Sequence, residues 1–203
     1  MKCFHILCII TLLISLKAYS QLDKKIWLVG GTGSFQSYTQ YYTLPPPGDG
    51  WTNYNFDIEA SAKVGYFVID KLVLGLSPSY TFEKSENDTK TISGKSSKFS
   101  VGPFARYYFL NMYKPFNVLA EVNYQTGIQS QGSWRKDNGP ISSFSFFVGP
   151  ELFFNPTIGI EVLLGYKATK ETIDGSRLSI TDARNGFQVA VGLQIHLENF
   201  KNK

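Results

Sequence analysis

The sequence contains almost no cysteine or histidine. Both cysteines, Cys3 and Cys8, and one of the two histidines, His5, lie at the very start of a chain of 203 residues. The rest of the chain therefore cannot form a disulfide or a cysteine-ligated metal site. It also has a single imidazole for acid–base chemistry, that of His196.

The sequence is also poor in charge. Charged residues make up 18% of it, against about 25% in ordinary soluble domains. The formal net charge is +4, and two of the cations, Lys2 and Lys17, lie in the N-terminal segment. Nucleic-acid binders carry a strongly basic surface, so the composition predicts no nucleic-acid partner.

The one long apolar run lies at the N-terminus. Residues 4–16 follow Lys2 and are too few to cross a bilayer as a helix, but they match the core of a signal peptide. Ala18, Tyr19 and Ser20 fit the small-x-small pattern of a cleavage site. We therefore predict a signal peptide over residues 1–20, cleaved near Ser20, and one domain over residues 21–203.

The domain shows apolar residues at every second position. The last run alternates most regularly, with apolar residues at Phe187, Val189, Val191, Leu193, Ile195 and Leu197. Successive side chains of a strand point to opposite faces, so this segment has one apolar and one small or polar face. The same pattern predicts strands at residues 25–40, 53–68, 72–83, 97–110, 116–129, 141–154, 158–170 and 187–197. In the first of these the facing is ambiguous, because Trp27 and Phe35 compete with Ile26 and Leu28.

The connections between these strands alternate in length. Residues 69–71, 111–114 and 155–157 are tight turns, whereas residues 41–52, 84–96, 130–140 and 171–185 are longer loops. Short turns and long loops in alternation are typical of bacterial outer-membrane barrels. We therefore predict an all-β fold, an eight-stranded antiparallel up-and-down transmembrane β-barrel. Pro78, Pro103 and Pro150 fall inside strands, where we expect bulges or distorted pairing.

Alternation alone leaves two kinds of barrel open. A soluble lipocalin-like barrel, periplasmic or secreted, would turn its apolar face inward around an apolar ligand. The membrane barrel is favoured because the polar face carries few charges and because aromatic residues gather near both ends of the strands, as in interfacial girdles.

Three segments resemble the small porin-like outer-membrane β-barrels of Gram-negative bacteria, the OmpA and OmpX type. They are residues 101–109, residues 116–121 and the final strand. The resemblance implies a monomer in the outer membrane, in contact with its lipid and lipopolysaccharide, and inserted by the barrel assembly machinery. Members of the family usually end on an aromatic residue; here Phe200 is followed by three further residues.

Charged residues on the polar face are the candidates for function. Arg106 and Glu121 lie on the same face either side of one tight turn, so we expect an ion pair inside the barrel. A buried charge must be paired. The predicted lumen network comprises Glu59, Lys63, Arg106, Glu121, Glu151, Glu161 and His196. It could close the lumen or line a narrow ion path.

No catalytic, cofactor or metal site is predicted. His196 could act as a base, but a hydrogen-bonding role inside the lumen is favoured. An acyl-transfer enzyme would need a Ser/His/acid set near the long loops, where the sequence has no histidine. We therefore expect no enzyme activity. The proline-rich loop over residues 41–52 is the best candidate for an external binding surface, whose ligand is unknown.

Overall fold

The computed structural model describes residues 25–42, 51–87, 93–110, 115–131, 139–174 and 179–197. The predicted signal peptide, Phe200 and most of the loop over residues 41–52 lie outside them. None of the described residues forms a helix that could cross a membrane.

The strands are β1 (Trp27–Tyr42), β2 (Trp51–Ile69), β3 (Leu72–Asn87), β4 (Ser93–Tyr108), β5 (Phe116–Gln131), β6 (Gly139–Phe153), β7 (Ile158–Asp174) and β8 (Ser179–Leu197).

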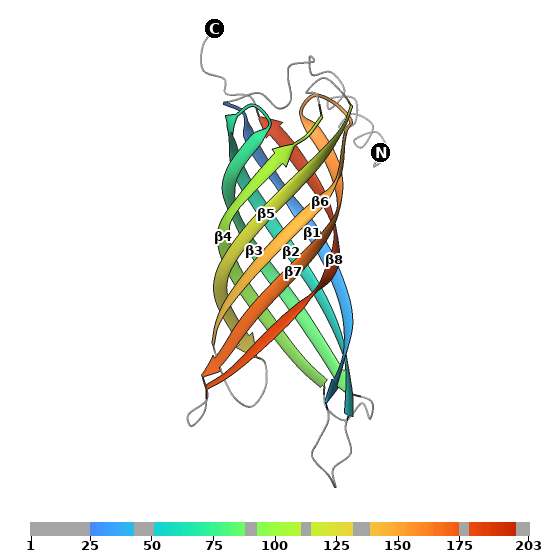
Figure 1. Cartoon of the computed structure of the whole chain (residues 1–203), viewed down its shortest axis with the longest axis vertical. Helices are drawn as coiled ribbons and strands as arrows, with labels where there is room; N and C mark the ends of the chain where they lie inside the picture. The colour runs from blue at the N-terminus through green and yellow to red at the C-terminus, as the bar shows by residue number, and fades with distance from the viewer. Residues whose placement is uncertain are drawn as a thin grey trace, which may run out of the picture.

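The eight strands form one closed antiparallel barrel (Figure 1). Each strand pairs with the next one along the chain, and β1 also pairs with β8. This up-and-down order confirms the predicted fold class. We call the end that carries the connections after β2, β4 and β6 the turn end, and the opposite end the loop end.

Several strands continue beyond their predicted limits at the loop end. The β3–β4 ladder runs on to the pair Glu86↔Ser93, and the β7–β8 ladder runs on to Asp174↔Ser179. These extensions are mostly polar on both faces, so no hydrophobic alternation marks them in the sequence. Backbone pairing with the neighbouring strand holds them in the barrel.

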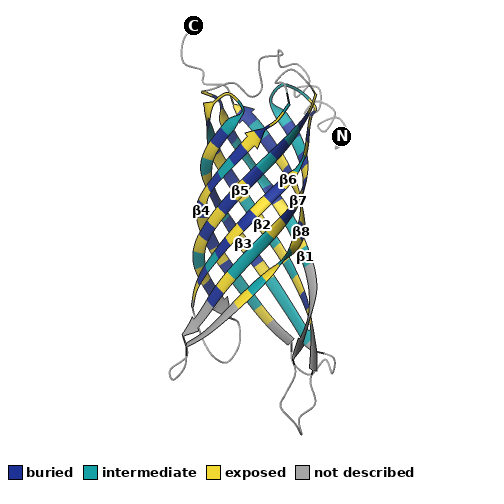
Figure 2. Cartoon of the chain, viewed as in Figure 1, coloured by how far each residue is buried: buried dark blue, intermediate teal, exposed yellow. Residues whose placement is uncertain are grey.

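The apolar face of each strand points outward. Along β8, Val189 and Leu193 are 49% and 47% exposed, whereas Gln188 and Gln194 are 5% and 0% exposed. Figure 2 shows this alternation of exposed and buried residues over the barrel. The first strand, whose facing is ambiguous in the sequence, turns Trp27 outward and Leu28 into the lumen.

Each of the three strand prolines coincides with an interruption of one ladder. The β4–β5 ladder breaks off at Val101↔Thr126 and resumes at Phe104↔Asn123 in the same register, because Pro103 has no N–H to donate. Pro78 interrupts the β2–β3 ladder and Pro150 interrupts the β6–β7 ladder in the same way. The expected distortion is therefore present, but without a bulge; the single register shift in these three ladders lies between Phe67 and Ile69.

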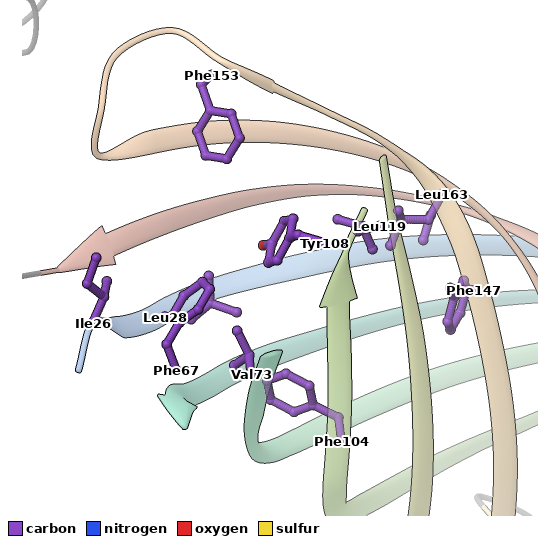
Figure 3. Packing of buried hydrophobic residues seen from close by; sticks show 11 residues of the cluster. Ile26, Leu28, Phe67, Val73, Phe104, Tyr108, Leu119, Phe147, Phe153 and Leu163 are labelled. Atoms are coloured by element: carbon purple, nitrogen blue, oxygen red, sulfur yellow. The ribbon is translucent and has the colours of Figure 1, made fainter. Parts of the chain in front are cut away.

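Apolar side chains fill much of the lumen towards the turn end (Figure 3). The ring of Phe67 stacks on that of Tyr108 with centroids 5.9 Å apart. The ring of Phe104 lies against Gly65 and Gly75, where a Cβ would collide with it. The buried set comprises Ile26, Leu28, Phe67, Val73, Phe104, Tyr108, Leu119, Phe147, Phe153, Leu163 and Ala190. The lumen is thus closely packed at this level.

Candidate functional site in the barrel lumen

Arg106 and Glu121 are direct register partners on β4 and β5. The guanidinium donates from Nε to Glu121 Oε2 at 2.8 Å, and Nη2 lies 2.6 Å from the same oxygen. Both side chains are fully buried. The register of the two strands brings them together, because side chains opposite each other across an antiparallel pair share one face.

Arg106 also reaches across the lumen to β7. Its Nη1 and Nη2 atoms donate to Glu161 Oε2 and Oε1 at 2.7 and 3.1 Å, a bidentate geometry that suits the planar guanidinium. Lys63 of β2 approaches from another side, with Nζ 2.6 Å from Glu121 Oε1 and 3.9 Å from Glu161 Oε1. Gln194 donates its amide to Glu161 Oε1 at 2.9 Å.

Glu151 of β6 joins this group towards the turn end. The Tyr108 hydroxyl donates to Glu151 Oε2 at 2.9 Å, and His196 Nε2 lies 3.0 Å from Glu151 Oε1. The imidazole packs against Phe67 and Phe153, whose ring centroids are 5.8 and 5.2 Å away. His196 therefore connects the charged group with the apolar packing shown in Figure 3.

We call these residues the Arg106 cluster: Lys63, Arg106, Tyr108, Glu121, Glu151, Glu161, Gln194 and His196. Three carboxylates share two permanent cations and one imidazole, so the opposite charges nearly balance. Charges buried to this degree are stable only when they are paired and hydrogen-bonded on most sides. The cluster therefore joins strands on opposite sides of the lumen through buried ion pairs and hydrogen bonds.

A second charged group lies nearer the loop end. Lys98 bonds to both Glu83 and Glu171, and Lys167 bonds to Glu59. Arg184 lies 3.4 Å from Glu171 and 3.7 Å from Glu83. These side chains surround open space instead of filling it.

That open space is a cavity of about 290 Å³. It is lined by Asp57, Glu59, Glu83, Lys98, Lys167, Glu171, Arg184 and Gln188 together with smaller polar residues of the loop-side strands. A second, smaller cavity of about 20 Å³ lies below it, between Glu59 and Glu121, with room for little more than one water molecule. The Arg106 cluster and the apolar packing then follow.

The structure thus divides the predicted lumen network into two levels. Six of its residues lie in the Arg106 cluster, whereas Glu59 lines the loop-side cavity. Sequence analysis missed Glu83, Lys98, Glu171 and Arg184, which lie on strand extensions or near predicted strand ends. Their inward position follows from continuing the period of two along each strand.

No group of three or more metal-binding side chains occurs among the described residues. The other polar groups of the lumen are mainly hydroxyls and amides, such as Ser79, which lies within hydrogen-bond distance of Ser100 and Gln125. They hold neighbouring strands together across the interior.

No protein-family model and no curated protein matches this sequence. Among solved structures, the chain is similar to OprG, an outer membrane protein of Pseudomonas aeruginosa. The two are 13% identical, with a TM-score of 0.55 over 90% of this chain and all of OprG. The chain has the fold of a small outer-membrane β-barrel. A second structure with this fold, Neisserial surface protein A, is 14% identical, with a TM-score of 0.52 over 84% of this chain and 96% of that protein.

Proposed function

We propose that the protein is a transmembrane barrel of the bacterial outer membrane that is closed to passive flow and acts as a structural or surface-interaction protein. The observation that carries this proposal is the arrangement of the two faces. Exposed apolar side chains surround the barrel, and the Arg106 cluster crosses its lumen.

The outer surface supports a lipid environment. Large apolar residues on every strand are about half exposed, for example Leu76, Phe99 and Leu164, which in water would form an apolar patch far larger than soluble monomers carry. Aromatic residues such as Trp27 and Phe116 lie near the turn end, and Tyr54 and Tyr80 lie nearer the loop end. Two such bands are typical of the two membrane interfaces.

The interior supports a structural role for the Arg106 cluster. Its ion pairs and hydrogen bonds tie β2, β4, β5, β6, β7 and β8 together, so an ion could pass only by breaking several buried contacts. We further propose that the barrel is a monomer, that it contacts outer-membrane lipid and lipopolysaccharide, and that it is inserted by the barrel assembly machinery after signal cleavage.

Cell fractionation tests the location. The full chain, expressed in a Gram-negative host, should remain with the outer membrane after carbonate washing and should migrate differently on a gel before and after boiling. The soluble lipocalin-like alternative requires an apolar interior, whereas the loop-side cavity is lined by charged and polar side chains. Recovery of folded protein in the periplasmic extract would support that alternative and overturn the proposal.

Electrical recording tests the closed lumen. Protein reconstituted into planar bilayers should give no steady conductance steps, because the buried ion pairs of the Arg106 cluster cross the lumen. A steady conductance in the wild-type protein that changes in Arg106→Ala would show an ion path in place of a plug. Lys84→Ala is a matched control, because its ammonium pairs with Glu86 and its side chain is 44% exposed.

A further inference from the structure

The β1–β8 ladder ends well before the loop end. It comprises nine pairs, from Trp27↔Leu197 to Phe35↔Val189. In contrast, β1 stays paired with β2 as far as Tyr42, and β8 stays paired with β7 as far as Ser179, at the loop end of the strand. The β6–β7 ladder also stops before its strands end, at Ile141↔Glu171, but only Gly139 and Pro140 of β6 lie beyond that pair.

The missing pairs leave an opening between the two backbones. The Gln36 side chain crosses part of it, because its Nε2 lies against Gly186, where a Cβ would collide with it. If the register of the ladder continued, Gln36 would face Gln188 and Tyr42 would face Asp182, but the described strands make none of these pairs. Figure 1 shows the β1–β2 and β7–β8 hairpins separating towards the loop end. We call this opening the β1–β8 notch, formed by residues 36–42 of β1 and 182–188 of β8.

The notch leads into the loop-side cavity. Ser34 and Gln36 of β1 and Arg184 and Gln188 of β8 all line that cavity. Ala183 and Asn185 also line it, although their register places them on the outward face of β8. The cavity is therefore bounded by the two edges of the notch.

Two polar atoms in the cavity wall have no hydrogen-bond partner. They are Nε2 of Gln188, whose side chain is only 5% exposed, and Oδ1 of Asp57. A buried donor or acceptor without a partner is unfavourable. A ligand that brings an acceptor for Gln188 and a donor for Asp57 would satisfy both atoms.

The charges around the cavity indicate the kind of head group. Four carboxylates and three cations line it: Asp57, Glu59, Glu83, Glu171, Lys98, Lys167 and Arg184. The three cations pair with Glu59, Glu83 and Glu171. A wall of such ion pairs fits a zwitterionic group better than a simple anion or cation, because each charge of the ligand would lie beside a wall charge of the opposite sign.

The outer side of the notch is apolar. The rings of Phe35 and Phe56 meet edge-on with centroids 4.9 Å apart on one side of it, and those of Tyr166 and Phe187 meet at 5.4 Å on the other. Both pairs lie at the level where the β1–β8 ladder stops. The two ring pairs form two aromatic walls, one on each side of the notch, and the polar loop-side cavity lies behind them.

The unpaired backbone fixes the level of the notch in a membrane. Free N–H and C=O groups are too costly for the hydrocarbon region, so residues 36–42 and 182–188 belong among the head groups. An amphiphile of the outer leaflet places its own head group at that level and its chain beside Phe35 and Phe187.

We propose that the β1–β8 notch and its cavity bind a single-chain zwitterionic amphiphile. The head group occupies the cavity, and the acyl chain leaves through the notch between the two aromatic walls. An extended peptide that adds a strand to the notch is the competing occupant, but it would leave the charged cavity empty. The inference rests on the proposed membrane location.

The first experiment measures binding. Full-length protein is placed in vesicles of phosphatidylglycerol and cardiolipin, and lysophosphatidylethanolamine with a nitroxide-labelled chain is added. We expect saturable binding of one molecule per barrel. Glycerophosphoethanolamine, which lacks the chain, and a fatty acid, which lacks the zwitterion, should each compete at least tenfold more weakly. Equal competition by either compound would overturn the proposal.

Variants test the cavity. Gln188→Leu should weaken binding about tenfold, whereas Gln129→Leu should not change it. Gln129 is equally buried, 4% against 5%, but it does not line the cavity. Unchanged binding in Gln188→Leu would overturn the proposal.

A reversible cross-link tests the notch. In the double variant Gln36→Cys/Gln188→Cys, oxidation should reduce binding at least tenfold and reduction should restore it. The control is Gly33→Cys/Val191→Cys, which joins an existing pair at a position where a Cβ meets nothing within 4 Å. Its oxidation should have no effect.

Membrane insertion is measured on every sample, so that two failures remain distinct. Protein that resists carbonate and is heat-modifiable but does not bind the lipid overturns this inference alone. Slow amide exchange of residues 36–42 and 182–188 without lipid would show that another strand fills the notch, and would also overturn it.

Discussion

Replacing Arg106 by methionine removes the centre of the Arg106 cluster. The guanidinium makes three hydrogen bonds to Glu121 and Glu161 between 2.7 and 3.1 Å, and it is fully buried. Methionine is of similar length and apolar, so the change leaves little empty volume. The main effect is the loss of positive charge beside three carboxylates.

The expected cost is large. Removing one partner from a buried ion pair typically costs about 3–5 kcal/mol, because the remaining charge stays desolvated. In Arg106→Met, Glu121 keeps Lys63 as a close partner at 2.6 Å, but Glu161 keeps only Gln194 at hydrogen-bond distance. We therefore expect about 3–5 kcal/mol, or between two and four orders of magnitude in the unfolding equilibrium constant.

The measurement is urea unfolding of the barrel in vesicles, followed by the heat-modifiable band on a gel. The control is Lys167→Met, whose partner Glu59 is 15% exposed beside the open cavity, where solvent screens the remaining charge. It should cost less than half as much as Arg106→Met.

A double variant tests the reasoning. Arg106→Met/Glu161→Gln removes one charge of each sign, so it should be more stable than Arg106→Met alone by at least about 1 kcal/mol. If Arg106→Met costs less than about 1 kcal/mol, or if the second change adds to the damage, buried charge imbalance does not explain the stability of the lumen.

Two further predictions concern the barrel wall. Gly75→Ala should cost about 1–3 kcal/mol, since its Cβ would lie 2.6 Å from both Gly65 Cα and the Phe104 ring; Gly33→Ala, with open space, should be nearly neutral, and thermal unfolding compares the two. Leu193→Arg should cost about 2–4 kcal/mol if Leu193 faces the middle of the bilayer, against about 0–1 for Phe187→Arg near the interface. Equal urea midpoints for the two arginine variants would contradict the membrane location.

The sequence predicts the local features of this fold well. Alternation has a period of two, so strand number and sidedness follow directly from residues such as Val189 and Leu193. The pairing of Arg106 with Glu121 also follows, because a tight turn determines which residues of a hairpin are opposite.

Contacts across the lumen could not be derived in this way. Whether Arg106 meets Glu161 depends on the tilt and stagger of all eight strands, which no local pattern records. The loop-side cluster was missed because polar residues on both faces conceal the ends of β7 and β8. The early end of the β1–β8 ladder could not be predicted either, because β1 and β8 are the first and last strands and no local sequence pattern relates them.

The three ladder interruptions together affect where the barrel wall deforms under load. Pro78, Pro103 and Pro150 each lie in a hairpin closed at the turn end, a few residues from the turn. The interruptions therefore recur at a similar height in every second strand pair, where fewer backbone hydrogen bonds join the neighbouring strands. We therefore expect the wall to deform most easily at this height, and the buried ion pairs of Arg106, which cross the interior nearby, to resist that deformation.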